Sequence, residues 1–180
     1  MIMQFYSIGH STRSFRQFAA ILERASIDLI ADVRAFPRSR RNPEYNIDIL
    51  PITLGASSIS YEYFADLGGR RQWQVDVPDC CNALWRNRSF HNYADYALSD
   101  AFQDSLDALI SRGSTNKLAV MCSEAVWWRC HRRIIADHLI SRGHAVCHLM
   151  GLGQMSRATL TAGAVVIEHG RVVYPPSESD

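Results

Sequence analysis

The apolar residues of this chain fall into two kinds of segment, which alternate from the N-terminus to about residue 150. Some segments are short continuous apolar runs, as is typical of buried strands. These runs predict strands at residues 4–8, 28–33, 118–121 and 144–150. In other segments the apolar residues recur three or four positions apart, which predicts amphipathic helices at residues 15–25, 93–112 and 131–143. A weaker alternation predicts one more strand at residues 60–64.

Several residues mark where the predicted helices begin and end. Ser14 and Gln17 have the spacing of a capping box, which indicates a helix N-terminus. Asn46 is an N-cap candidate for a short helix, although Pro51 is expected to shorten or kink that helix. Gly113 follows the long apolar pattern and fits a C-terminal cap.

The alternation of strands and helices predicts an α/β fold, because a strand that returns through a helix runs parallel to its predecessor. We therefore expect a single domain over residues 1–174, with a mostly parallel sheet and helices on both faces. After that sheet, two segments rich in valine, at 164–168 and 171–174, flank a His-Gly pair, which predicts a C-terminal β-hairpin extension. Residues 175–180 are expected to fray.

Composition and charge limit the classes of function that are open to this protein. The formal net charge is only +1, so attraction to a charged partner must come from local clusters. No apolar run approaches the roughly 20 residues of a membrane span, and the first residues lack the pattern of a signal peptide. The five cysteines are odd in number and two are adjacent, which favours free thiols over a disulfide framework. We expect a cytoplasmic protein that does not contact membranes.

The densest group of reactive side chains lies between the apolar run at 118–121 and the helix that follows it. This loop combines thiols, a carboxylate, an imidazole and guanidinium groups, from Cys122, Glu124, Arg129, Cys130, His131, Arg132 and Arg133. Ligands of open α/β sheets bind beyond the carboxyl ends of the strands, and anions favour helix N-termini. The strand–loop–helix junction is therefore the candidate site.

Polar residues also occur at the ends of other predicted strands, namely His10, Asp32 with Arg34, and His148. Because parallel strands share one carboxyl edge, we expect these residues to converge with Cys122 in a single cleft. An unpaired buried carboxylate is costly. We therefore expect Asp32 to be buried and paired, while Arg34 faces the ligand.

Cys122 has two interpretations. It directly follows a buried strand, so it fits a small core residue. It also fits a catalytic thiolate, whose pKa is lowered by the helix N-terminus and by Arg129 or Arg132. We expect the cationic groups to prevail, with Cys122 as the nucleophile and with Glu124 and His131 as the groups that transfer protons. The spacing to Arg129 is one residue longer than the Cys-x5-Arg of phosphatases.

The same loop also has the residue types of a metal site, through Cys122, Glu124, Cys130 and His131. Paired Cys-x2-Cys or His-x3-His spacing is absent, and mixtures of carboxylate and thiolate are not typical of structural zinc. We therefore expect neither a metal ion nor another cofactor. Three further histidines are expected on the solvated surface: His138, His144 and His169.

Arginines are concentrated in three predicted loops, at residues 38–41, 70–71 and 129–133. Guanidinium groups bind phosphate or carboxylate through two parallel hydrogen bonds, so we expect an anion-binding cleft. The expected ligand-binding residues are Gly9, His10, Ser11, Arg34, Arg40, Arg41, Arg129 and Arg132. Four interspersed tryptophans fit either stacking on a base or closing of the core: Trp73, Trp85, Trp127 and Trp128.

Five stretches of the chain carry a family resemblance. They are YSIGHSTRS (Tyr6–Ser14), DVRAFPRSRRNPEYN (Asp32–Asn46), LGGRR (Leu67–Arg71), WRNRSFHNYADYA (Trp85–Ala97) and MCSEAVWWRCHRRIIADHL (Met121–Leu139). Together they resemble the uncharacterised family named domain of unknown function 488. The resemblance extends to about Gly151, implies an α/β fold and makes these loops features of the family, but it implies no activity. Pro51 and the hairpin after Gly153 depart from the family pattern.

The sequence leaves more than one class of function open. The first is a thiol-assisted enzyme that acts on a small phosphorylated or nucleotide-like substrate. The alternative is a nucleic-acid-binding module without catalysis, in which arginines bind phosphates and tryptophans stack on bases. A third is an interaction domain without chemistry. The expected partner is thus an anionic small molecule or nucleic acid, and the sequence sets no oligomeric state.

Overall fold

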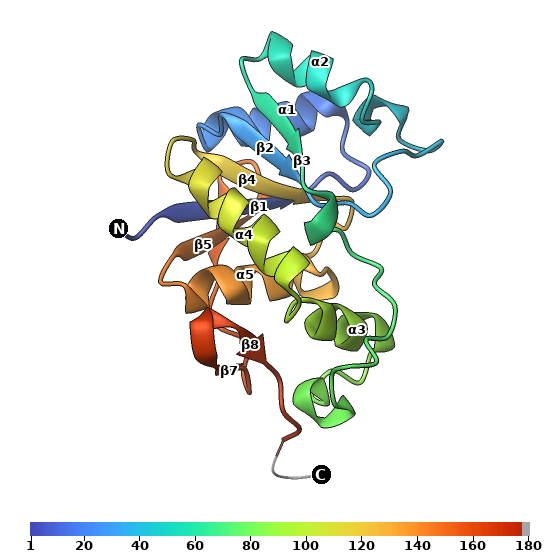
Figure 1. Cartoon of the computed structure of the whole chain (residues 1–180). Helices are drawn as coiled ribbons and strands as arrows, with labels where there is room; N and C mark the ends of the chain where they lie inside the picture. Colours follow the sequence, from blue (N-terminus) through green and yellow to red (C-terminus); the bar gives the residue numbers. More distant parts are fainter. Residues whose placement is uncertain (178–180) are drawn as a thin grey trace.

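The computed structural model describes residues 1–177 and places six strands in one sheet, in the order β3-β2-β4-β1-β5-β6 (Figure 1). The strands are β1 (Gln4–Gly9), β2 (Leu29–Asp32), β3 (Ser60–Tyr63), β4 (Leu118–Cys122), β5 (Ala145–Gly151) and β6 (Gln154–Arg157). The first five run parallel to their neighbours, and β6 pairs antiparallel with β5. The predicted α/β fold with a mostly parallel sheet is confirmed.

Helices cover both faces of this sheet (Figure 1). They are α1 (Phe15–Arg24), α2 (Leu50–Ala56), α3 (Arg88–Tyr96), α4 (Asp100–Gly113) and α5 (Arg132–Ser141). Successive side chains of the fully buried strand β4 point to opposite faces. Val120 therefore packs in the core formed with α3, α4 and α5, whereas Met121 packs in a second core formed with α1 and α2. Burial on both faces explains why β4 is a continuous apolar run.

Helices α1 and α5 begin where the sequence predicts. The Ser14 side chain accepts a hydrogen bond from the Gln17 backbone at 3.3 Å, and the Gln17 side chain accepts one from the Ser14 backbone at 3.0 Å. This is the predicted capping box. His131 is the residue that precedes α5.

The expectation of a surface position is wrong for His138, which is fully buried in α5, whereas His169 is exposed as expected.

The single long helix predicted over residues 93–112 is wrong, because two helices, α3 and α4, occupy this region. Helix α3 ends at Tyr96 with Ala97 as its C-cap, and Ser99 starts α4 by accepting a hydrogen bond from the backbone of Phe102 at 3.3 Å. Both helices contribute apolar residues to the same core. The apolar spacing therefore continues across the break and conceals it. A serine at the N-cap was the local signal for the second helix.

Two predicted caps are also wrong. Asn46 does not cap α2; its side-chain oxygen instead accepts a hydrogen bond from the backbone of Ser39 at 2.7 Å. Pro51 lies in the first turn of α2, where a helix needs no proline N–H, so it helps to start this helix rather than break it. Gly113 is the last residue of α4, and Ser114 follows it as the cap.

The chain beyond β5 forms two hairpins. Gly153, with φ at +70°, turns the chain from β5 into β6, a strand that the apolar pattern did not predict. The predicted C-terminal hairpin is confirmed as β7 (Val165–Val166) paired antiparallel with β8 (Val172–Val173). Of the tail expected to fray, residues 178–180 lie outside the described residues.

Candidate functional site

The carboxyl ends of β1, β2 and β4 lie together at one edge of the sheet. In the parallel register Gly9 pairs with Cys122, and Asp32 pairs with Met121. Immediately beyond β1, the backbone of His10 donates a hydrogen bond to the carbonyl of Cys122 at 3.0 Å. The prediction that Gly9, Asp32 and Cys122 share one edge is therefore confirmed.

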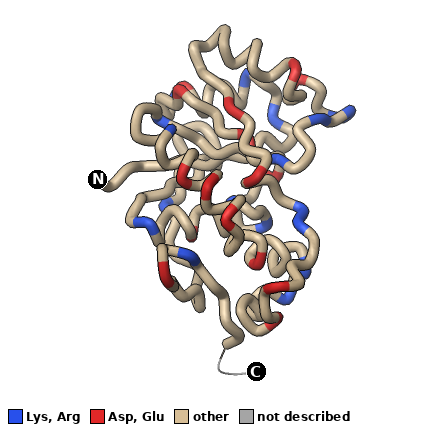
Figure 2. Tube along the Cα trace, in the orientation of Figure 1, with Lys and Arg blue, Asp and Glu red and all other residues tan. Residues whose placement is uncertain are grey.

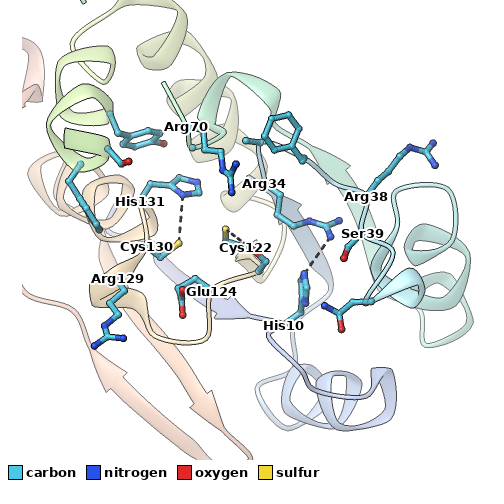
Figure 3. Close-up of a pocket in the computed structure, with 18 residues that line it drawn as sticks. His10, Arg34, Arg38, Ser39, Arg70, Cys122, Glu124, Arg129, Cys130 and His131 are labelled. Atoms are coloured by element: carbon cyan, nitrogen blue, oxygen red, sulfur yellow. Dashed lines mark hydrogen bonds between the residues drawn. The ribbon is translucent and has the colours of Figure 1, made fainter. Parts of the chain in front are cut away.

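A cavity of about 470 Å³ opens at this edge (Figure 3). Six of the predicted site residues line it: His10, Arg34, Cys122, Glu124, Arg129 and His131. The other walls come from the loop after β2, from the segment before α3 and from α3 itself. Lining residues outside the predicted site include Phe36, Arg38, Arg70, Tyr93 and Cys130. Segments far apart in the sequence thus enclose one space.

Five residues expected to bind the ligand do not line the cavity: Gly9, Ser11, Arg40, Arg41 and Arg132. Arg40 and Arg41 are exposed on the loop that follows β2. Gly9 allows two loops to approach each other, because a Cβ atom at this position would lie 1.8 Å from the carbonyl oxygen of Glu124. Ser11 donates a backbone hydrogen bond to Ser123 at 2.9 Å. These two residues therefore shape the edge of the sheet.

Two thiols and one imidazole form a compact cluster on the cavity wall. The Sγ atoms of Cys122 and Cys130 and a ring nitrogen of His131 all lie within 4.8 Å of one another. Cys130 Sγ is 3.7 Å from His131 Nδ1 (Figure 3). Both cysteines are buried, and Cys122 is only 7% exposed. The fold thus joins residues whose spacing in the sequence gives no recognisable motif.

Arg132 contacts this cluster from inside the protein. Its Nε donates to Cys130 Sγ at 3.3 Å, and its Nη2 donates to the carbonyl oxygen of Glu124 at 2.5 Å. Its Nη1 lies 3.4 Å from the hydroxyl of Ser7. The guanidinium is buried and its donors are directed to protein atoms. Arg132 is therefore placed to stabilise a thiolate at Cys130.

The two thiols differ in acidity, and the expected thiolate at Cys122 is wrong. The hydrogen bond with Cys130, together with burial, raises the pKa of Cys122 well above its usual value. Burial also raises the pKa of Cys130, but the hydrogen bond from Cys122 and the charge of Arg132 outweigh it and lower this pKa to about 6. The negative charge is thus favoured at Cys130. Arg129, by contrast, points away from the thiols in Figure 3.

His131 is held in one orientation by its second ring nitrogen. Nε2 lies 2.9 Å from the carbonyl oxygen of Val33. Because a carbonyl can only accept, Nε2 carries the ring proton and donates a hydrogen bond to this oxygen. Nδ1 is then left with a lone pair directed towards Cys130. Burial lowers the pKa of His131, which favours this neutral form.

Asp32 and Arg34 form a buried ion pair below the cavity. Asp32 accepts hydrogen bonds from Arg34 Nη2 at 2.7 Å, from the Arg34 backbone at 3.0 Å and from the Tyr61 hydroxyl at 2.6 Å. The expectation that Asp32 is buried and paired is confirmed. Arg34 Nη2 also donates to the carbonyl of Tyr45. Most donors of Arg34 are therefore directed into the protein, and Nη1 lies 3.5 Å from His10.

His10 is a neutral group on the cavity wall. Its ring stacks on Tyr45 with centroids 4.1 Å apart, and its Nδ1 is 3.0 Å from the carbonyl of Ser11. Burial lowers the pKa of His10 to about 4, with a further contribution from the charge of Arg34. This histidine therefore offers an uncharged hydrogen-bonding edge at neutral pH.

The cavity walls are rich in positive charge. Four arginines line the cavity, Arg34, Arg38, Arg70 and Arg129, and Glu124 is the acidic residue among the described lining residues. Arg38 forms an exposed ion pair with Asp48 at 3.0 Å. Figure 2 shows further basic positions along the loop between β2 and α2, on the right of the view. This distribution favours a negatively charged ligand.

The tryptophans do not line the cavity in the part of the chain that the structure describes. Trp127 stacks on His148 with centroids 4.5 Å apart, and Trp85 packs against Tyr174. The expectation that His148 belongs to the cleft is wrong, because this residue lies within β5 and contacts the Ser7 hydroxyl at 2.6 Å. The geometry thus favours the structural role of Trp127 and Trp85 over base stacking.

Comparison with known proteins gives one finding. The model of the family described as domain of unknown function DUF488 matches residues 14–139. No curated protein and no solved structure matches the chain. Within residues 1–177, no helix combines the length and the apolar character needed to cross a membrane.

Proposed function

The chain belongs to the DUF488 family, a domain of unknown function, and for this member we propose a thiol-dependent enzyme that acts on a small anionic substrate. One observation carries the proposal: the cluster of Cys122, Cys130 and His131 shares a cavity wall with exposed arginines. Reactive groups and groups that hold an anion therefore face the same space. That combination is expected of a catalytic site.

The cavity suits a small molecule in volume and charge. Its 470 Å³ lies within the range of about 300–1,000 Å³ typical of small-molecule sites. Arg38, Arg70 and Arg129 come from three separate segments, so they can approach an anion from different sides. Guanidinium groups bind phosphate and carboxylate through paired hydrogen bonds. We expect the substrate to carry one of these groups.

The thiol cluster is proposed to carry the chemistry. Cys130 is the residue that Arg132 stabilises as a thiolate, and Cys122 supports it by a hydrogen bond. His131 presents a lone pair to the thiols, and Glu124 is an exposed carboxylate on the same wall. These two residues are proposed to accept or donate protons during turnover.

The anion site is tested with inorganic phosphate in a calorimetric titration at fixed ionic strength. Replacement of Arg70 or Arg129 by alanine is expected to weaken binding about tenfold or more, as for loss of a charge-assisted hydrogen bond. The matched control is Arg40→Ala, which removes the same charge from an exposed position outside the cavity. Equal weakening in all three variants would show non-specific attraction and would contradict the proposal.

A nucleic-acid-binding module is the second candidate. The observation that favours it is the exposed loop after β2, in which Arg40, Arg41 and the 68%-exposed Phe36 lie close together in sequence. If this loop binds several phosphates, affinity for a single-stranded oligonucleotide should fall steeply between about 50 and 200 mM salt. Weak binding that does not change with salt would eliminate this candidate and leave the small-molecule site.

A further inference from the structure

The donor atoms of Cys122, Cys130 and His131 have the spacing of ligands around one metal ion. In a tetrahedral zinc site, Zn–S distances of about 2.3 Å and Zn–N distances of about 2.0–2.1 Å separate the donors by about 3.5–3.8 Å. Cys130 Sγ and His131 Nδ1 are 3.7 Å apart, and all three donors lie within 4.8 Å of one another. A shared ion therefore requires only small movements of the side chains.

His131 is oriented as a metal-binding histidine. A ligating imidazole usually donates its other N–H to a carboxylate or a backbone carbonyl, which fixes the ring and the tautomer. Here Nε2 donates to the carbonyl of Val33 at 2.9 Å, and Nδ1 faces the thiols. Tyr93 packs against the same ring with centroids 4.9 Å apart. The free lone pair is thus held in place before any ligand binds.

Gly69 lets the backbone pack closely against one face of the His131 ring. A Cβ atom at this position would lie 2.8 Å from His131 Nδ1, 3.1 Å from Cε1 and 3.3 Å from Cγ, and the first of these is closer than real Cβ contacts allow. The φ of Gly69 is not in the left-handed region, so backbone strain does not require glycine here. Glycine is instead required because the backbone packs on the ring face, and this contact helps to hold the ring with its in-plane Nδ1 lone pair directed to the thiols.

The surroundings also suit thiolate ligands. Arg132 donates to Cys130 Sγ at 3.3 Å, a hydrogen bond that stabilises negative charge on sulfur and persists when sulfur binds a metal. Two thiolates balance the charge of a divalent ion, so the buried cluster would carry little net charge. Sulfur ligands select zinc and similar ions over magnesium and calcium.

We propose that Cys122, Cys130 and His131 bind one zinc ion, with the fourth coordination position open to the cavity. Three protein ligands and one open position are the arrangement of catalytic zinc, and two cysteines with one histidine are a known ligand set. All three residues line the cavity, so an anion held by Arg70 can reach the open position. With the ion bound, both thiolates and His131 Nδ1 serve as ligands, so Glu124 is the residue left to transfer protons. This catalytic role for the ion rests on the proposed function, whereas zinc binding itself can be measured alone.

The loop after β4 lacks the paired ligand spacing on which the expectation of no metal rests. Such paired spacing is needed only where one turn or knuckle contributes both ligands of a pair. Here Cys122 ends β4, while Cys130 and His131 precede α5 across a loop. The loop returns these donors to the strand end, so the fold supplies a proximity that the spacing does not encode.

The test uses the full chain, reduced and freed of metal with a chelator, then titrated with Zn²⁺ against a competing indicator. We expect about one ion per chain. Cobalt in place of zinc should give absorption bands of thiolate-to-metal charge transfer and of tetrahedral coordination. Replacing Cys122 or Cys130 by serine should weaken zinc binding at least about 100-fold and remove the charge-transfer bands. Cys147→Ser, in β5 away from the cluster, is the control and should bind as the wild type.

A second variant separates loss of ligands from loss of folding. Gly69→Ala keeps every ligand residue but adds a methyl group over the face of the His131 ring, which must then shift. It should weaken zinc binding about tenfold or more while circular dichroism shows a folded protein. The proposal is overturned if the reduced, folded wild type binds no zinc. It is also overturned if Cys122→Ser and Cys130→Ser bind zinc as the wild type does.

The zinc and anion experiments fail independently. In one outcome, zinc binding depends on the cysteines but phosphate binding is unchanged by replacement of Arg70 or Arg129. That outcome would support the metal site and refute the proposed substrate class. Phosphate binding that depends on these arginines in a protein that binds no zinc would refute the metal site and leave the anion cavity.

Discussion

At the scale of single residues, Asp32 holds the end of strand β2 in place at the edge of the sheet where the cavity opens. Its carboxylate is fully buried and is neutralised by Arg34, with a further hydrogen bond from Tyr61. The pair joins β2 to the loop that follows, because Arg34 also bonds the carbonyl of Tyr45. The arginine that the sequence assigns to a ligand is thus mainly a support for the cavity wall.

Replacing Asp32 by asparagine is predicted to destabilise the protein by about 3–5 kcal/mol, because Arg34 would remain buried without its counter-charge. Urea denaturation followed by circular dichroism measures this change. The matched control is Asp48→Asn, which breaks the exposed pair with Arg38 and should leave the midpoint unchanged. An Asp32→Asn protein of normal stability that loses only phosphate binding would contradict the structural role.

At the scale of elements, the contact between α4 and α5 depends on an uncharged histidine. His138 of α5 is fully buried, lies against Phe102 with ring centroids 5.0 Å apart, and approaches the Gln103 side-chain nitrogen at 3.5 Å. Burial, with the nearby charges of Arg142 and Arg171, lowers the pKa of His138 to about 3. The folded protein therefore holds His138 neutral across most of the acidic range.

Acid is predicted to destabilise the protein through this residue. In the unfolded chain His138 binds a proton below its ordinary pKa of about 6.5, whereas the folded state resists protonation down to about pH 3. Its stabilising contribution is therefore fully present above about pH 6.5 and falls, by up to about 1.4 kcal/mol per pH unit, as the pH drops.

Urea titrations at pH 7, 6 and 5 measure this dependence. The His138→Leu variant should lose less stability than the wild type between pH 7 and 5, while the exposed His169→Asn variant should follow the wild type. A His138→Leu protein whose stability falls as steeply as that of the wild type would contradict the assignment.

At the scale of the whole molecule, the C-terminal segment packs against the core of the domain. Tyr174, directly after β8, is fully buried and donates to Asp137 of α5 at 2.7 Å. Its backbone N–H donates to Asn82 Oδ1 at 3.0 Å, and Asn82 Nδ2 donates to Asp95 of α3 at 2.7 Å. The segment of residues 72–89, irregular in sequence, is thereby joined to the C-terminal hairpin.

We propose that residues 1–174 unfold as one cooperative unit, as expected of a single domain. Tyr174→Ala should then lower the stability of the whole protein by about 3–5 kcal/mol, as for loss of a buried aromatic side chain. Tryptophan fluorescence and circular dichroism should report the same midpoint in the wild type and in this variant. The control is Val166→Ala, in the half-exposed β7, with an effect within about 0.5 kcal/mol. Separate transitions for the two probes would show that the hairpin is an independent unit.

The sequence alone determined the elements whose pattern is local. The run that forms β4 is apolar because both of its faces are covered, and the Ser14–Gln17 capping box places the start of α1. The parallel sheet and its shared edge followed from the order of these elements. The chain also marked the junction after β4 as the candidate site, since reactive side chains are concentrated there. Apolar periodicity failed at the break between α3 and α4, because two helices on one core continue the same pattern.

Only the tertiary structure decided which side chains meet and which of them carry charge. Arg132, and not Arg129, contacts the thiols, and it favours the thiolate at Cys130 instead of Cys122. Gly69 was not selected from the sequence, because its importance lies in a contact with His131 across more than 60 positions. The physical reason is common to these cases: pKa values and ligand geometry depend on distances of a few ångströms between residues remote in the chain. Hydrophobic periodicity fixes which face of an element is buried, and three-dimensional packing fixes which atoms are neighbours.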